Sequence, residues 1–143
     1  MRFWDSSALV ALVIEETSSR SCRKLVRADG TIAVWILTRS EMVSAVQRKH
    51  RRAELDATST KTALKRVALL ASRWPDVDAV DLVRDRAERI LATHDLRAAD
   101  ALQLAAALVL VEDRPKRFPF VTADERLAAA AEAEGFEAIV PKA

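Results

Sequence analysis

The sequence predicts one α/β domain in which helices cover a parallel sheet. Short apolar segments alternate with longer helical ones, which is the element order of parallel sheets. Half of the 143 residues are hydrophobic, enough for the core of a single domain spanning residues 1–143. The chain shows no run of 18 uncharged apolar residues and no basic-apolar leader. We therefore expect a cytoplasmic protein without a membrane span.

Two strands and four helices are expected in the first half of the chain. Apolar Phe3 and Trp4 form a buried strand, and Asp29-Gly30 is a turn signal before the next one. Pro75 ends the last of these helices because proline cannot continue a helix. The expected elements are a strand at Arg2–Trp4, helices over Ser6–Glu15 and Thr17–Arg27, a strand at Thr31–Val34, and helices over Leu37–Arg52 and Asp56–Trp74.

The second half should supply two or three further strands and three helices. Pro115 follows the end of one helix, and Gly135 is suited to cap the last one. Thr122 and Glu125 have capping-box spacing, which predicts Thr122 as the N-cap of that last helix. The expected elements are a short strand at Val77–Val80, helices over Leu82–Thr93 and Leu96–Val111, a strand at Phe118–Val121, a helix from Thr122 to Glu134, and an alternating edge strand at Phe136–Val140.

Four acidic residues stand in apolar surroundings. Asp5 and Asp124 follow short buried strands, so their carboxylates should emerge at the sheet edge where α/β proteins bind ligands. Glu41 and Asp100 lie on helix faces that should point inward. Two charges about 5 Å apart repel by roughly 3 kcal/mol at an effective dielectric near 20. Four clustered carboxylates therefore indicate a divalent cation, with Mg²⁺ or Mn²⁺ suited to oxygen ligands.

Each of these acids, taken singly, also has a structural explanation. Asp5 could open the helix that begins near Ser6, and Asp124 lies in a first helical turn, where the helix dipole favours negative charge. Capping does not explain Glu41 or Asp100 on inward faces. A shared metal site accounts for all four acids together.

Positive charge is concentrated in the first half of the chain. Residues 1–73 hold 14 Lys or Arg against 7 acids, a net +7, whereas residues 74–143 hold 9 against 14, a net −5. A basic stretch on two helices could follow a phosphate backbone, and the alternative is an ordinary solvated helix face. The stretch comprises Arg48, Lys49, Arg51, Arg52, Lys61, Lys65, Arg66 and Arg73. A second basic group, Arg114, Lys116 and Arg117, precedes the strand that leads to Asp124 and is a candidate for substrate phosphate contacts.

The sequence holds few residues that would support zinc binding, catalysis by histidine or phosphotransfer. Cys22 is the only cysteine and, with His50 and His94 alone, does not make a zinc ligand set. His94 lies at a helix junction and is a weak candidate for a proton shuttle. An aspartyl phosphatase needs a second Asp two residues after Asp5, where this chain has Ser7, and the paired acids of a receiver domain are absent. The three tryptophans adjoin apolar runs and are expected in the core, rather than stacked on bases.

Four segments resemble the ordered acidic motifs of PIN-domain nucleases, and most of all those of VapC-type toxins. They are Phe3–Val10, Ser40-Glu41, Leu96–Ala105 and Phe120–Leu127, spread in order over nearly the whole chain. The resemblance implies a three-layer α/β/α fold with a short-stranded, mainly parallel sheet. It also implies an Mg²⁺- or Mn²⁺-dependent endoribonuclease, the toxin of a toxin–antitoxin module. The implied partners are an RNA substrate, a VapB-like antitoxin and, commonly, a second copy of the chain in a homodimer.

Motif by motif, the resemblance assigns the catalytic acids as Asp5, Glu41, Asp100 and Asp124, supported by the hydroxyls of Ser6 and Thr122. Asp5 and Asp100 would bind the main metal, while Glu41 and Asp124 would orient water or help to hold a second ion. Attack by a metal-activated water would leave 5′-phosphate and 3′-hydroxyl ends. Gln103 stands where relatives often carry another polar residue. The alternative is a PIN-like module that binds RNA or a partner without cutting.

Overall fold

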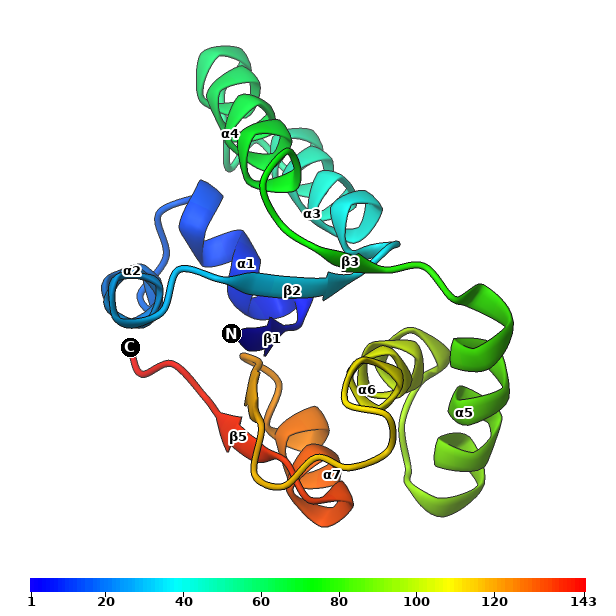
Figure 1. Ribbon diagram of the computed structural model, residues 1–143. Helices are drawn as coiled ribbons and strands as arrows, with labels where there is room; N and C mark the ends of the chain where they lie inside the picture. Colours follow the sequence, from blue (N-terminus) through cyan, green and yellow to red (C-terminus); the bar gives the residue numbers. More distant parts are fainter.

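Five short strands form one parallel sheet in the order β3-β2-β1-β4-β5 in the computed structural model, which describes residues 1–143 (Figure 1). All four strand pairings are parallel, where the sequence predicted a mainly parallel sheet. The elements are β1 (Arg2–Trp4), α1 (Ser6–Val13), α2 (Ser19–Ala28), β2 (Ile32–Trp35), α3 (Thr38–Arg51), α4 (Ala57–Ala71), β3 (Asp76–Val77), α5 (Val80–Thr93), α6 (Ala98–Leu110), β4 (Pro119–Val121), α7 (Glu125–Glu134) and β5 (Glu137–Ile139).

Every expected strand and helix is present, but some ends differ from the prediction. Of the strand predicted at Val77–Val80, only Val77 belongs to β3, because the chain leaves the sheet at Asp78 and Val80 is the first residue of α5. The sheet offers β3 only two pairing positions on β2, and the Val80 amide then donates to the Asp78 carbonyl at 2.8 Å as the chain turns into the helix. Gly135 caps α7 in the left-handed conformation, at φ 107°, as predicted.

Helices cover both faces of the sheet, so the fold has three layers (Figure 1). Successive strand side chains point to opposite faces, and Phe3 and Trp4 accordingly enter different cores. Trp4 packs with the helices α1, α3 and α4, whereas Phe3 packs with α5, α6 and α7. The expected core positions of the tryptophans are confirmed for the buried Trp4 and Trp35, and Trp74 is partly buried against the first core.

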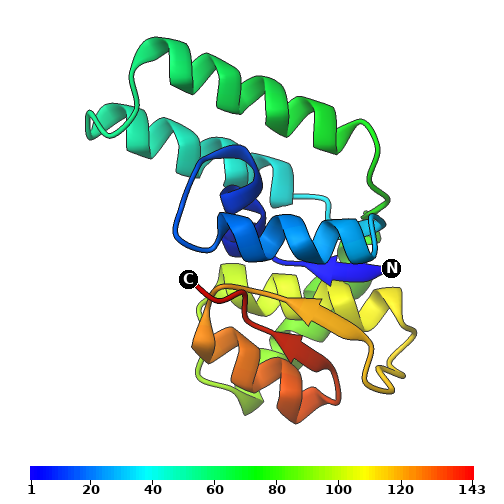
Figure 2. The ribbon, with the colours of Figure 1, turned by 90° about the vertical axis from the view of Figure 1, so that its left-hand side faces the viewer.

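The charge asymmetry of the sequence becomes an asymmetry between the two helix layers. Residues 1–73 supply α1 to α4, and residues 74–143 supply α5 to α7. The basic α3–α4 hairpin projects beyond the sheet (Figure 2). No helix combines the length and apolar character needed to cross a bilayer.

The strand order determines where a site can form. All five strands are parallel, so their carboxyl ends lie along one edge of the sheet. The central β1 pairs with β2 on one side and with β4 on the other. Chain order reverses between β1 and β4, and such a switch point opens a crevice at the carboxyl edge.

We expect Phe120→Ala to lower the free energy of unfolding by about 3–5 kcal/mol, because it empties the centre of an aromatic cluster. Phe120 is 0% exposed, and its ring centroid lies 5.3 Å from that of Phe3 and 5.7 Å from that of Phe136. Urea unfolding measures the loss. Leu69→Ala, on a side chain 53% exposed on α4, is the control and should change stability by less than about 0.5 kcal/mol. Equal effects of the two variants would contradict this account of the core.

Candidate active site

The four acids predicted from the sequence come from four elements and converge at the carboxyl edge of the sheet. Asp5 directly follows β1, and its amide donates to the Val121 carbonyl at 2.9 Å at the end of the neighbouring β4. Glu41 and Asp100 lie in the first turns of α3 and α6, and Asp124 immediately precedes α7. The negative charges of neighbouring acids help to raise the pKa of Asp5, of Glu41 and of Asp100.

Asp5 is a buried carboxylate held by hydroxyl groups. It is only 3% exposed, and its Oδ2 accepts hydrogen bonds from Ser7 and, at 2.8 Å, from Thr122. Burial raises the pKa of the Asp5 carboxyl, the two hydroxyl bonds oppose the rise, and the charge of Asp124 adds to it. Asp5 occupies the N-cap position of α1 but makes no side-chain cap hydrogen bond, so helix capping does not explain this acid.

Glu41 is fixed from both sides of the sheet edge. Its Oε1 accepts a 2.8 Å hydrogen bond from the Gln103 amide on α6, and its Oε2 accepts a 3.2 Å bond from the Ser6 hydroxyl on α1. The Gln103 side chain is 0% exposed and also donates to the Thr38 hydroxyl at 3.0 Å. Burial raises the pKa of Glu41, as do the charges of Asp5 and Asp100.

Asp100 is the most accessible member of the cluster to a ligand, because it accepts no side-chain or backbone hydrogen bond in the structure. Burial raises its pKa first, followed by the charges of Asp5 and Asp124. The guanidinium groups of Arg97 and Arg126 lower the same pKa, which places two cations near this carboxylate.

Asp124 has two roles, and the predicted capping box is wrong. The N-cap of α7 is Asp124, whose Oδ1 accepts bonds from the amides of Arg126 at 2.8 Å and Leu127 at 3.0 Å. Thr122 lies two residues before that cap, where its hydroxyl donates to Asp5 at 2.8 Å and accepts a 3.1 Å bond from the Asp124 amide. The structural explanation of Asp124 as a capping residue is therefore right, while its charge still acts on Asp5 and Asp100.

Three polar residues of the site were not predicted to support the acids. Ser7 bonds Asp5 and also accepts a 3.0 Å bond from the Ala123 amide, which ties α1 to the end of β4. Thr38 and Gln103 form the buried link to Glu41 described above. In the sequence, Gln103 could have been singled out as one amide side chain within the apolar run that begins at Ala101.

The donor set fits a hard divalent cation. It consists only of carboxylate and hydroxyl oxygens, and mutual repulsion among the acids favours a positive ion between them. No group of three or more acids is arranged so that it could hold a metal ion by itself. Both oxygens of Glu41, both oxygens of Asp5 and Oδ1 of Asp124 accept hydrogen bonds from the protein, although the Ser6 hydroxyl reaches Oδ1 of Asp5 only at 3.4 Å. Mg²⁺ needs no such group because it usually keeps several waters and takes one or two carboxylates. The accessible Asp100 and Oδ1 of Asp5 suit that role.

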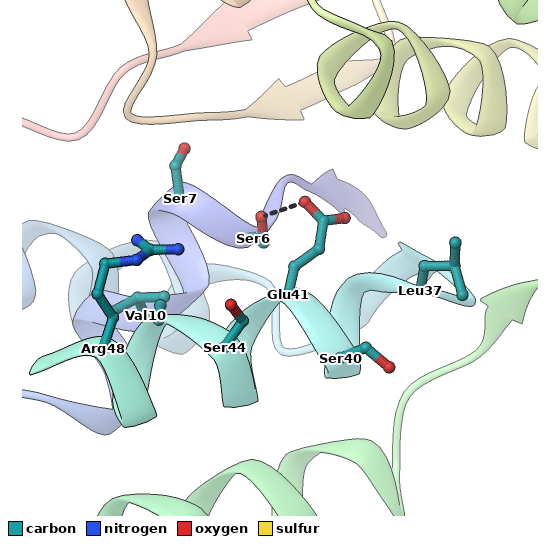
Figure 3. A pocket seen from close by; sticks show the side chains of 9 residues that line it. Ser6, Ser7, Val10, Leu37, Ser40, Glu41, Ser44 and Arg48 are labelled. Carbon is teal, nitrogen blue, oxygen red and sulfur yellow. Dashed lines mark hydrogen bonds between the residues drawn. The ribbon is translucent and has the colours of Figure 1, made fainter. Parts of the chain in front are cut away.

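A groove between α1 and α3 opens beside the acids (Figure 3). Its polar lining is four serines with Glu41 and Arg48, namely Ser6, Ser7, Ser40 and Ser44. Val10, Leu37 and Ala45 provide its apolar surface. We refer to it below as the α1/α3 groove.

The predicted basic group of Arg114, Lys116 and Arg117 lies away from the acids. These residues precede β4, whereas Asp124 follows it, and three strand residues span about 10 Å. Arg117 is paired with Glu132 at 2.7 Å. The structure thus places this group at the opposite sheet edge, and Arg48, Arg97 and Arg126 are the cations beside the acidic site.

Neither histidine lies among the acids. His94 Nε2 is 2.7 Å from Glu134 Oε2, and the exposed His50 ring contacts the Leu55 carbonyl at 3.0 Å. The proposed shuttle role of His94 has no geometric support.

Comparisons with known proteins agree with this architecture. The PIN domain sequence profile matches residues 2–133. A toxin–antitoxin complex from Klebsiella pneumoniae has a similar fold, with a TM-score of 0.66 and 15% identity, covering 99% of this chain and 98% of that one. FitAcB from Neisseria gonorrhoeae gives a TM-score of 0.68 at 15% identity, with the same coverage of 99% and 98%. Such low identity shows a shared fold alone. No curated protein sequence matches this chain.

We expect Asp100→Asn to stabilise the metal-free protein increasingly as pH rises. The pKa of Asp100 is raised in the folded state above its ordinary value of 3.8. The stability that protonated Asp100 contributes is therefore complete below pH 3.8 and is lost as the pH passes through the raised pKa. Asparagine does not titrate, so the advantage of the variant should grow between pH 4.5 and 7.5, to about 1 kcal/mol or less for a partly exposed group.

Urea unfolding in EDTA across that pH range tests this expectation. Asp85→Asn, on a side chain 72% exposed on α5, controls for the removal of one surface charge. A constant difference between Asp100→Asn and the wild type at every pH would show that Asp100 is not destabilised by its neighbours.

Proposed function

Because the chain belongs to the PIN-domain family, we propose that it is an endoribonuclease that uses Mg²⁺ or Mn²⁺ at the acidic site. PIN domains are typically nucleases. The observation that carries the proposal is the buried Asp5 carboxylate, which experiences the charge of Asp124 and whose own charge acts on Glu41 and Asp100. Burying such a charge among other acids costs stability. RNA as the substrate comes from the resemblance to VapC-type toxins and agrees with the basic first half of the chain.

Each side chain has a definite part in this proposal. Ser7 and Thr122 hold Oδ2 of Asp5, whereas Oδ1 accepts only a long 3.4 Å bond from Ser6. Oδ1 and the Asp100 carboxylate would therefore be the direct ligands of a cation. Gln103 and Ser6 hold Glu41 as a hydrogen-bond acceptor that can orient the attacking water. A bound divalent cation would lower the pKa of water and stabilise charge on the phosphate oxygens. Attack by water predicts products with 5′-phosphate and 3′-hydroxyl ends.

The proposal includes a protein partner. The similar structure from Klebsiella pneumoniae is a toxin–antitoxin complex, and we propose that this chain is likewise the toxin of such a pair. Its antitoxin would bind across the acidic site, where the exposed Ile36 and Leu37 offer apolar surface. A homodimer of the chain forms part of the same proposal.

We expect the purified protein to cut RNA with Mg²⁺ or Mn²⁺ and to lose cleavage, by at least about 100-fold, in Asp5→Asn or Asp100→Asn. Each substitution removes one negative charge from the direct ligands while keeping the size of the side chain. Gel analysis of total RNA, with determination of the fragment ends, measures the outcome.

Asp85→Asn again serves as the matched control and should cut like the wild type. Wild-type cleavage rates in Asp5→Asn would refute the site. Folded, metal-bound and antitoxin-free protein that cuts no RNA would instead favour the alternative, a PIN-like module that binds RNA or a partner without cutting.

We also expect Mg²⁺ to stabilise the folded protein independently of any cleavage. A ligand that binds only the folded state stabilises it by about 2.7 kcal/mol at 100 times its dissociation constant. Thermal unfolding midpoints should therefore rise with Mg²⁺ concentration in the wild type and much less in Asp100→Asn. Equal shifts in both proteins would mean that Mg²⁺ binds elsewhere.

A further inference from the structure

We propose that the α1/α3 groove binds the RNA strand on one side of the scissile phosphate, and that Arg48 contacts a phosphate one to three nucleotides away from the cut. This inference deepens the proposed function and rests on it.

The α1/α3 groove starts inside the acidic site and leads away from it. Glu41 belongs both to the acidic cluster and to the groove lining, and Ser6 contacts Glu41 from the facing helix (Figure 3). Arg48 lies seven residues further along α3, roughly 10 Å at 1.5 Å per residue. Stacked nucleotides rise about 3.4 Å each, so this length accommodates up to three of them and fewer in an extended strand.

The guanidinium of Arg48 has no partner within the protein. It forms no ion pair and donates no hydrogen bond, whereas Arg23 on the neighbouring helix pairs with Glu15 at 3.0 Å. Figure 3 shows the Arg48 side chain reaching from α3 towards α1, over Val10. An unpaired guanidinium at the end of a groove is suited to bidentate contact with a phosphate.

The rest of the groove lining matches a ribose–phosphate strand. Ser6, Ser7, Ser40 and Ser44 present hydroxyls, which can hydrogen-bond phosphate oxygens and ribose hydroxyls. Val10 and Ala45 provide small apolar contacts for a sugar or base face. Acidic or bulky aromatic side chains, which would repel or block the strand, are absent from the lining apart from Glu41 itself.

Beyond Arg48, the surface stays positive. Arg51 and Arg52 follow three and four residues later on or next to the same helix, and neither forms an ion pair. On α4, Lys61 and Lys65 line a shallow cleft against α3 and are also without acidic partners. The sequence left open whether this basic stretch is a phosphate track or an ordinary solvated face. Arg51 and Arg52 follow Arg48 at the end of α3, which favours the track for these three arginines. The cleft lined by Lys61 and Lys65 shares no residue with the α1/α3 groove.

The test compares wild type, Arg48→Ala, Arg48→Lys and Arg20→Ala on a short single-stranded RNA that contains one cut site. Arg20 is exposed on α2 and unpaired, so its variant controls for loss of one positive charge. A set of substrates carries a single uncharged methylphosphonate at successive positions on each side of the cut. The measured quantities are kcat and KM, at several salt concentrations.

We expect Arg48→Ala to lower kcat/KM at least about tenfold, with partial recovery in Arg48→Lys and none of this loss in Arg20→Ala. The slope of log kcat/KM against log salt should fall by about 0.7 in Arg48→Ala, as for the loss of one phosphate contact to a single strand. Neutralising one phosphate within three nucleotides of the cut should impair the wild type by a similar factor and leave Arg48→Ala unaffected.

Two results would overturn the inference. In the first, Arg48→Ala retains the wild-type kcat/KM. The same conclusion follows if a methylphosphonate at every position lowers the kcat/KM of Arg48→Ala by the same factor as that of the wild type. In the second, Arg48→Ala cuts RNA normally but escapes inhibition by the antitoxin, which would assign the groove to the protein partner.

Failure of the proposed nuclease function can be distinguished from failure of the groove inference. If the wild type cuts no RNA, fluorescence anisotropy of the same labelled RNA in EDTA decides the inference alone. Tenfold weaker binding by Arg48→Ala than by Arg20→Ala would support the groove as an RNA site, and equal binding would refute it.

Discussion

The buried carboxylate of Asp5 is the constraint around which the site is built. Burying an ionised group costs several kcal/mol unless hydrogen bonds or opposite charges compensate. The protein compensates with hydroxyl donors, from Ser7 on α1 and Thr122 after β4, instead of with a cationic side chain. The hydrogen bonds to Oδ2 of Asp5 therefore join the ends of two central strands to the first helix, while Oδ1 has only a long 3.4 Å bond from Ser6.

The same edge of the sheet is where the two helix layers meet. Elsewhere the strands separate α3 from α6, but beyond the carboxyl ends of β1 and β2 the amide of Gln103 reaches Glu41 and Thr38 directly. Glu41 is held by α6 on one side and by Ser6 of α1 on the other. Such buried polar links fix side-chain positions closely, because breaking any of them leaves a buried group unpaired.

The distribution of charge makes one side of the acidic site more attractive to a polyanion than the other. The acids gather at the sheet edge, while the α1–α4 layer is basic and the opposite layer is acidic. A polyanionic strand approaching this edge is favoured along the basic layer, the side on which the α1/α3 groove opens. If the proposed function holds, electrostatic steering and the groove lining both favour α3 as the helix along which an RNA strand lies.

The elements of the fold and the positions of the four acids could be predicted from short-range sequence patterns. Apolar strand segments, helix stops at Pro75 and Gly135, and acids placed just after strands are all visible within a few residues. Parallel strands then bring Asp5 and Asp124 to one edge whatever the exact strand order.

Which polar groups meet depends on the folded chain. The spacing of Thr122 and Glu125 predicted a capping box, but the Thr122 hydroxyl bonds Asp5 and the Asp124 amide, and Asp124 caps the helix. Gln103 and Glu41 pair across 62 positions of sequence, which no local pattern could show. The partner of a buried polar group depends on which strands are neighbours and on what else is buried beside it, and both are properties of the folded chain.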